Sequence, residues 1–237
     1  MRVMGHRWAA FSAGMALAAL LSAPAEAALT YSFFRITNNN VENLSSQLSL
    51  TIYGAGEEIP GTSADGQVTG NQALFVLGNN VGIASNITEF YIDDGTVVSG
   101  PQIFNSLTGF TAFTGAPVDP GNLPGGNTLV PPFVATSGFS AEADGNPDNG
   151  VDAAADLVGF RYQTTSGLTG IAAAFADGSL RVGLHVRSIG VAGGSDGYVT
   201  GDGDGGGTPP TQIPEPGTLA LLGLGLAGLA VSRRRRQ

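Results

Sequence analysis

One acidic segment has the residue types and the spacing for metal chemistry. Asp144, Asn146 and Asp148 place carboxylate and amide oxygens at alternate positions, and loops that bind Ca²⁺ offer oxygen ligands in this way. The segment departs from that pattern at Asn149, where the loop needs a glycine for its sharp turn, and at Ala155, where it needs a bidentate carboxylate. Two interpretations stay open: an acidic surface turn, and a weak calcium site on Asp144, Asn146 and Asp148.

A second segment, 193–197, contains the Gly-x-Ser-x-Gly string that surrounds some hydrolase nucleophiles. That chemistry requires a strand, a sharp turn and a helix around the serine, and a histidine base later in the chain. No helical pattern follows Ser195, and His185, the only histidine after residue 27, precedes it. His185 alternates with Arg181 and Arg187 at period two, so we expect it on a polar, solvated strand face. The residues therefore favour a non-catalytic protein.

The charges of the chain are distributed unevenly, and this limits its partners. The 237-residue chain has a net charge of −9, and its ten basic residues are all arginines. Between residues 28 and 212 only four arginines stand against 17 acidic residues, a balance of −13. Such a body repels phosphate backbones, which excludes nucleic acid as a partner. Because cysteine is absent, disulfides and thiolate sites are excluded as well, and the fold depends on burial.

Short segments with alternating apolar and polar residues must position these groups. Residues 46–53 place Leu48, Leu50 and Ile52 on one face, and residues 180–189 alternate in the same way. Further strand-like runs, separated by turn signals, cover 30–36, 73–77, 87–92, 133–139 and 157–163. Only 168–176 is typical of a helix. The pattern predicts an all-β domain over 28–198, an antiparallel β-sandwich of the jelly-roll or Ig-like kind with one short helix.

Residues 1–27 have the three parts of a signal peptide. Two arginines precede an apolar run over 8–21, and the small residues Ala25 and Ala27 fit a cleavage site after Ala27. The apolar run is too short for an ordinary membrane span. We therefore expect export through the Sec translocon and cleavage by signal peptidase.

The other end of the chain has the pattern of a membrane anchor. A linker rich in Gly, Asp and Pro is expected over 199–213, before a tail over 214–237. The apolar run over 217–232 rises roughly 24 Å as a helix, so this transmembrane helix crosses the inner membrane only marginally. Arg233, Arg234, Arg235 and Arg236 form the cytoplasmic stop, because their charges do not cross the bilayer cheaply.

The tail as a whole resembles a known sorting signal. Pro214, Glu215 and Pro216, then the apolar helix, then the arginine cluster over 233–236 are similar to the PEP-CTERM sorting domain. The resemblance implies that the chain is the substrate of a membrane-embedded exosortase, which cuts near the Pro-Glu-Pro motif. It further implies transfer to the cell surface or to an extracellular polysaccharide matrix. The alternative is a rigid, extended linker before a plain anchor.

Two functions for the body of the chain stay open. The first is a non-catalytic component of the surface or of the extracellular matrix. The second is a carbohydrate-binding module, or a hydrolase, that acts on exopolysaccharide and presents aromatic side chains. The candidate aromatic residues are Tyr31, Phe33, Tyr53, Phe90, Phe104, Phe110 and Phe113. The body also loosely resembles the β-rich domains that precede such tails in other exported proteins, through segments 35–39, 122–126 and 180–186. That resemblance supports the fold class and implies no activity.

Overall fold

The computed structural model describes residues 27–61, 68–80, 82–115, 121–201 and 211–212. Within these ranges it contains β1 (Leu29–Arg35), β2 (Leu48–Tyr53), β3 (Gln72–Asn79), β4 (Asn86–Asp94), β5 (Val98–Thr108), β6 (Phe113–Gly115), β7 (Ala141–Ala143), β8 (Leu157–Thr164), β9 (Leu180–Ile189), β10 (Gly194–Thr200) and β11 (Thr211–Gln212). The helices are α1 (Gly167–Asp177) and the 3-10 turns η2 (Gly126–Thr128) and η3 (Pro147–Asn149).

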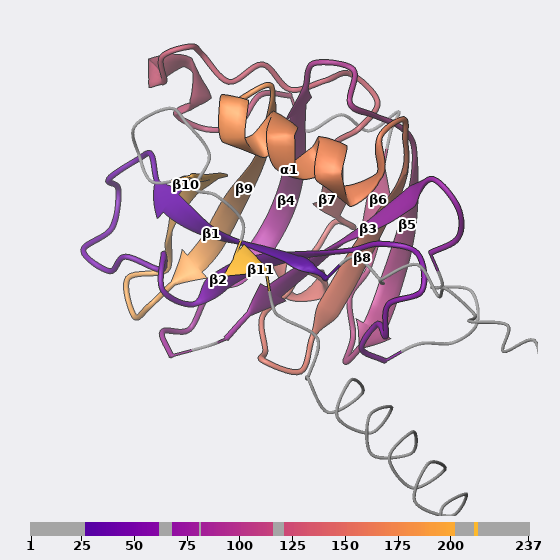
Figure 1. The fold of residues 1–237 in the computed structure, drawn as a ribbon. Helices are drawn as coiled ribbons and strands as arrows, with labels where there is room; N and C mark the ends of the chain where they lie inside the picture. The colour runs from indigo at the N-terminus through magenta and orange to yellow at the C-terminus, as the bar shows by residue number, and fades with distance from the viewer. Residues whose placement is uncertain (1–26, 62–67, 81, 116–120, 202–210, 213–237) are drawn as a thin grey trace, which may run out of the picture.

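All strand pairs are antiparallel, and they form one continuous path in the order β5-β8-β3-β2-β1-β10-β9-β4-β7-β6. Strand β1 lies at the middle of this path and crosses the front of the molecule in Figure 1. Its first half, Leu29–Ser32, pairs with β2, and its second half, Phe33–Arg35, pairs with β10. The prediction of an all-β antiparallel fold with one helix is confirmed; the choice of a sandwich over a barrel-like closure stays a prediction.

The main core forms where the two halves of this path face each other. In β2 the buried residues alternate as the sequence predicts, with Leu48, Leu50 and Ile52 inside. The Phe90 ring of β4 stacks on the Phe160 ring of β8, with centroids 4.0 Å apart. Stacked aromatic pairs stabilise a core beyond the area that they bury, so this contact joins the two halves directly.

Helix α1 covers one end of this core (Figure 1). Its buried residues Leu168, Ile171 and Phe175 follow the spacing of one helical face, as the segment 168–176 predicts. The Phe175 ring stacks on Tyr31 of β1 at 4.0 Å. The helix ends at Gly178, which adopts a left-handed conformation with φ 75°, because a glycine has no Cβ to oppose it.

Loops bury the outer faces of the sheet as well, which the sequence does not predict. Leu123 and Phe133, from the loop between β6 and β7, pack on Tyr91 and Val199. The strand expected over 133–139 is wrong. The Phe133 amide donates to Gly126 and the Thr136 amide to Ile92, at 2.9 and 2.6 Å, so these donors bind loop and strand carbonyls instead of forming a ladder.

The structure differs from the prediction at the linker expected over 199–213. Strand β10 continues to Thr200, and Thr211 and Gln212 pair as β11 with Thr30 and Leu29. The linker expected over 199–213 therefore has both ends in the sheet. The predicted signal peptide with Ala25, the Pro-Glu-Pro motif, the transmembrane helix over 217–232 and the arginine stop lie outside the described residues. Within the described residues, no helix has both the length and the hydropathy to cross a membrane.

The stacked pair in the core gives a test of this architecture. We expect Phe160→Ala to lower the free energy of unfolding by about 3–5 kcal/mol, since it removes a buried ring and leaves a cavity. Phe110→Ala is the matched control, because Phe110 is 63% exposed and its change should stay within about 0.5 kcal/mol. Urea unfolding followed by fluorescence or circular dichroism measures both. Equal effects would contradict the assignment of Phe160 to the core.

Candidate functional site

A buried carboxylate, Glu89, organises the polar groups on the outer face of β4 and β9. The β4–β9 register places Glu89 opposite His185, after a bulge between Ile87 and Glu89. Glu89 accepts hydrogen bonds from His185 Nδ1 at 2.9 Å, from the Arg187 guanidinium and from the Tyr91 hydroxyl. Because an ionised carboxylate only accepts, the Nδ1 nitrogen of His185 carries the proton.

The contacts of Glu89 determine its charge state. Burial raises the pKa of the Glu89 carboxyl, but the hydrogen bonds from His185 and Tyr91 and the charges of His185 and Arg187 outweigh burial and lower that pKa below its usual value. Burial and the bond to Glu89 raise the pKa of the Tyr91 hydroxyl far above its usual range. The cluster therefore holds an ionised acid and a protonated phenol, and Glu89 has no proton to give as a general acid.

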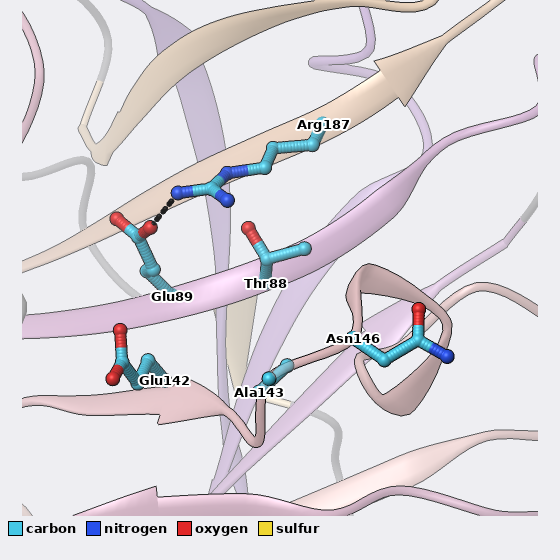
Figure 2. A pocket seen from close by; sticks show the side chains of 7 residues that line it. Thr88, Glu89, Glu142, Ala143, Asn146 and Arg187 are labelled. Carbon is cyan, nitrogen blue, oxygen red and sulfur yellow. Dashed lines mark hydrogen bonds and ion pairs between the residues drawn. The ribbon is translucent and has the colours of Figure 1, made fainter.

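A polar hollow of about 160 Å³ opens beside this cluster. Thr88, Glu89 and Arg187 line it from β4 and β9, and Glu142 lines it from β7. Figure 2 shows the Glu89 side chain leaning toward Arg187 and bonded to it, with Glu142 on the neighbouring strand and Asn146 on the turn beyond. Sequence reasoning missed both glutamates. The available signal was a charged residue inside the apolar run over 87–92.

The expectation that His185 and Arg181 lie on a solvated face is wrong. The His185 side chain is only 12% exposed, and Arg181 is buried. The Arg181 guanidinium donates to the carbonyls of Pro131 and Pro132, at 2.9 and 2.7 Å, and forms an ion pair with Asp93. The strand alternates as predicted, but the loop over 121–139 covers its polar face.

The Gly-x-Ser-x-Gly string lies in a different setting from a hydrolase nucleophile. Ser195 is in β10, beside a bulge between Gly194 and Asp196, and β10 continues after it to Thr200, where a hydrolase nucleophile would be followed by a helix. Asp196 is 1% exposed and accepts from Thr37 Oγ1 at 2.7 Å, the Asn39 amide at 2.8 Å and Asn40 Nδ2 at 3.0 Å. The aspartate therefore fastens the segment after β1 to β10.

These donors also determine the titration of Asp196. Burial raises the pKa of its carboxyl, while the Asn39 amide, the Thr37 hydroxyl, the Asn40 side chain and the Arg35 charge lower it, and the net shift is downward. Arg35 lies 3.7 Å from the carboxylate and also donates to the carbonyls of Asn40 and Glu42. Arg35 thus also holds the segment after β1 in place.

The candidate calcium residues form a turn with internal hydrogen bonds. Asn146 Oδ1 accepts from the Asp148 amide at 3.1 Å, and Asn149 Nδ2 donates to the Asp144 carbonyl at 2.7 Å. Over the part of the chain that the structure describes, no group of three or more His, Cys, Asp or Glu side chains is arranged to hold a metal ion. Calcium binding by Asp144, Asn146 and Asp148 stays a prediction.

The aromatic residues proposed for sugar stacking are mostly internal. Tyr31, Phe33, Phe90 and Phe113 are buried, and Tyr53 and Phe104 are half-buried. Phe110 is the exposed member of this set. The seven residues therefore do not include a pair of fully exposed rings.

Asp196 gives a pH-dependent test. Its lowered pKa means that its stabilisation is fully present above the unfolded-chain pKa of about 3.9 and is lost as the pH falls through the lower folded-state value. We expect Asp196→Asn to lower the free energy of unfolding by about 1–3 kcal/mol at pH 7. The difference in this free energy between the variant and the wild type should narrow below about pH 4. Urea titrations across pH measure this gap. Asp148→Asn, at an exposed acid, is the control, and an Asp196→Asn gap that stays constant with pH would contradict the assignment.

Comparison with known proteins addresses the tail and not the β-domain. Residues 212–236 match the family model of the PEP-CTERM protein-sorting motif. No curated protein and no solved structure matches the chain. The matched range contains Pro214, Glu215, Pro216 and the four arginines, so the resemblance seen in the sequence is confirmed. The chain is therefore a protein with a PEP-CTERM sorting motif, the signal that directs exported proteins to an exosortase and to the cell surface.

Proposed function

We propose that this protein is a non-catalytic component of the bacterial cell surface or extracellular matrix. The observation that carries the proposal is the sorting motif over 212–236. The chain leaves the cytoplasm through the Sec translocon and loses residues 1–27 to signal peptidase. The helix over 217–232 and the arginines after it hold it in the inner membrane until an exosortase cuts near Pro214–Pro216. The β-domain, sandwich-like in our proposal, then faces the cell exterior.

The use of the charged side chains supports a structural over a catalytic role. Glu89 and Asp196 have lowered pKa values, so each is an ionised acceptor for neighbouring donors. Partial burial, and then a hydrogen bond with Asp156, raise the pKa of Asp152. Asp156 in turn accepts from the amides of Phe110 and Ala153, at 3.0 and 3.1 Å. Asp196 and Asp156 stabilise loops, and Glu89 joins β4 to β9. Asp152 and Asp156 share a hydrogen bond, so they lie closer together than the separation of roughly 5–9.5 Å between the two carboxyls of a glycoside hydrolase.

Binding of carbohydrate is a second candidate function, and the polar hollow at Glu142 favours it. The hollow combines acceptor and donor side chains, among them the half-buried Glu142 and the partly exposed Arg187. Phe110 supplies an exposed ring. Its segment is joined to the turn at 144–149, because the backbone of Ala112 forms hydrogen bonds with Asp144 and Asn149. Exopolysaccharide is the ligand that such a surface protein would meet.

The first test of the proposed function is the mass and location of the protein in its own host, with and without the exosortase. We expect a C-terminus trimmed near Pro214–Pro216, and surface or matrix localisation, only when the exosortase is present. An intact tail in the inner membrane of both strains would contradict sorting and would indicate a permanent anchor.

The arginine stop gives a second test. We expect replacement of Arg233–Arg236 by glutamine to impair membrane retention and processing, since the charges that hold the tail in the cytoplasm are removed. Replacement of the same four residues by lysine is the matched control and should leave processing intact. Immunoblots of membrane and extracellular fractions measure both. Normal processing of the glutamine variant would refute the electrostatic role of the cluster.

A further inference from the structure

Two like charges face each other across β4 and β7. The strand register places Glu89 directly opposite Glu142, and at such positions the Cβ atoms lie about 4.5–5.5 Å apart and like charges destabilise the sheet. The nearby donors Tyr91, His185 and Arg187 all bond Glu89. Among the described residues, none donates to the Glu142 carboxylate. This pair therefore opposes folding, and residues retained at a cost in stability are found mainly at functional sites.

The polar hollow beside Glu142, called the recess below, contains both hydrogen-bond donors and hydrogen-bond acceptors. The Glu142 carboxylate is half-buried and only accepts. The Arg187 side chain is 44% exposed, and of its five N–H donors the structure uses those on Nη2 for Glu89. Figure 2 shows these groups lining the hollow, with Thr88 between Arg187 and the β7 side. The hollow thus has an acceptor on β7 and a donor on β9, both with capacity for further bonds.

The chemistry of the recess selects among ligand classes. An anion is repelled by Glu89, Glu142 and the balance of −13 in the body of the chain. Within the described ranges, no three His, Cys, Asp or Glu side chains converge on the hollow as a metal site. A volume of about 160 Å³ is below the range of roughly 300–1,000 Å³ typical of drug-sized ligands. Hydroxyl groups, which both donate and accept, match the acceptor Glu142 on one strand and the donor Arg187 on another.

We propose that this recess binds one sugar unit of a neutral polysaccharide. Glu142 accepts hydrogen bonds from ring hydroxyls, Arg187 donates to their oxygens, and Glu89 positions Arg187 through their ion pair. The inference rests on the carbohydrate-binding form of the proposed function and supplies its site. Bonds from hydroxyls to an ionised carboxylate are stronger than neutral ones, which gives Glu142 the leading role.

Binding of the detergent-solubilised full-length chain to immobilised polysaccharides tests the proposal. The probes are dextran, galactomannan and the neutral polysaccharide fraction of the host matrix, with alginate as the anionic counterpart. We expect binding to at least one neutral probe, competition by its own monosaccharide, and no effect of a calcium chelator. Glu142→Gln should weaken binding at least about tenfold, while Glu58→Gln, at an exposed acid on the loop after β2, should leave it unchanged. Equal binding by both variants, binding to alginate alone, loss of binding with the chelator, or no binding to any neutral probe would each overturn the proposal.

Two further measurements distinguish a loss of sugar binding at this site from an effect on folding or on sorting. Glu142→Gln should unfold at the same temperature as the wild type or higher, because it removes the repulsion with Glu89. A markedly lower unfolding temperature would show a structural role for Glu142 and overturn the assignment. The variant should also be trimmed by the exosortase like the wild type. Normal trimming without sugar binding would refute this inference alone, whereas an untrimmed wild type would refute the proposed sorting route.

Discussion

The architecture depends on the shared pairing of strand β1. In seven residues β1 pairs with β2, β10 and β11, and it is the only connection between the β5-β8-β3-β2 half and the β10-β9-β4-β7-β6 half in the ladder that the structure describes. The two halves then bury their aromatic residues against each other through Phe90 and Phe160. A chain without cysteine has no covalent link to replace this pairing. The backbone hydrogen bonds of β1 and the burial of apolar side chains between the two halves therefore hold the domain together.

Several charged side chains of the domain bind loops to the sheet. Asp196 and Arg35 hold the segment after β1, and Arg181 holds the loop before β7 through two proline carbonyls and Asp93. A buried charge is costly unless it is paired, so these pairs specify where each loop lies. Glu142 differs, because its neighbour across the strand has the same charge.

The sequence predicts those elements whose burial follows from local periodicity. The segments predicted as strands or helix over 46–53, 157–163, 180–189 and 168–176 contain β2, β8, β9 and α1, and in β2 and β9 the predicted apolar faces lie inside, on the core. Strand β5 was missed since most of its residues are exposed and it alternates poorly, and β6 and β7 are three residues long. The environment of His185 and Glu89 could not be predicted, because the pairing of β4 with β9, which brings together residues 96 positions apart, creates it. Of the candidate site, only the charges themselves were visible in the sequence.

The small strand β11 has a mechanical consequence. It pairs with the first residues of β1 immediately before the sorting motif, through two residue pairs. When an anchored protein is pulled from its C-terminal side, the load reaches this two-residue ladder before it reaches β10. The two pairs of β11 thus bear such a load first, and they can part while β1 keeps its own pairing with β2 and β10.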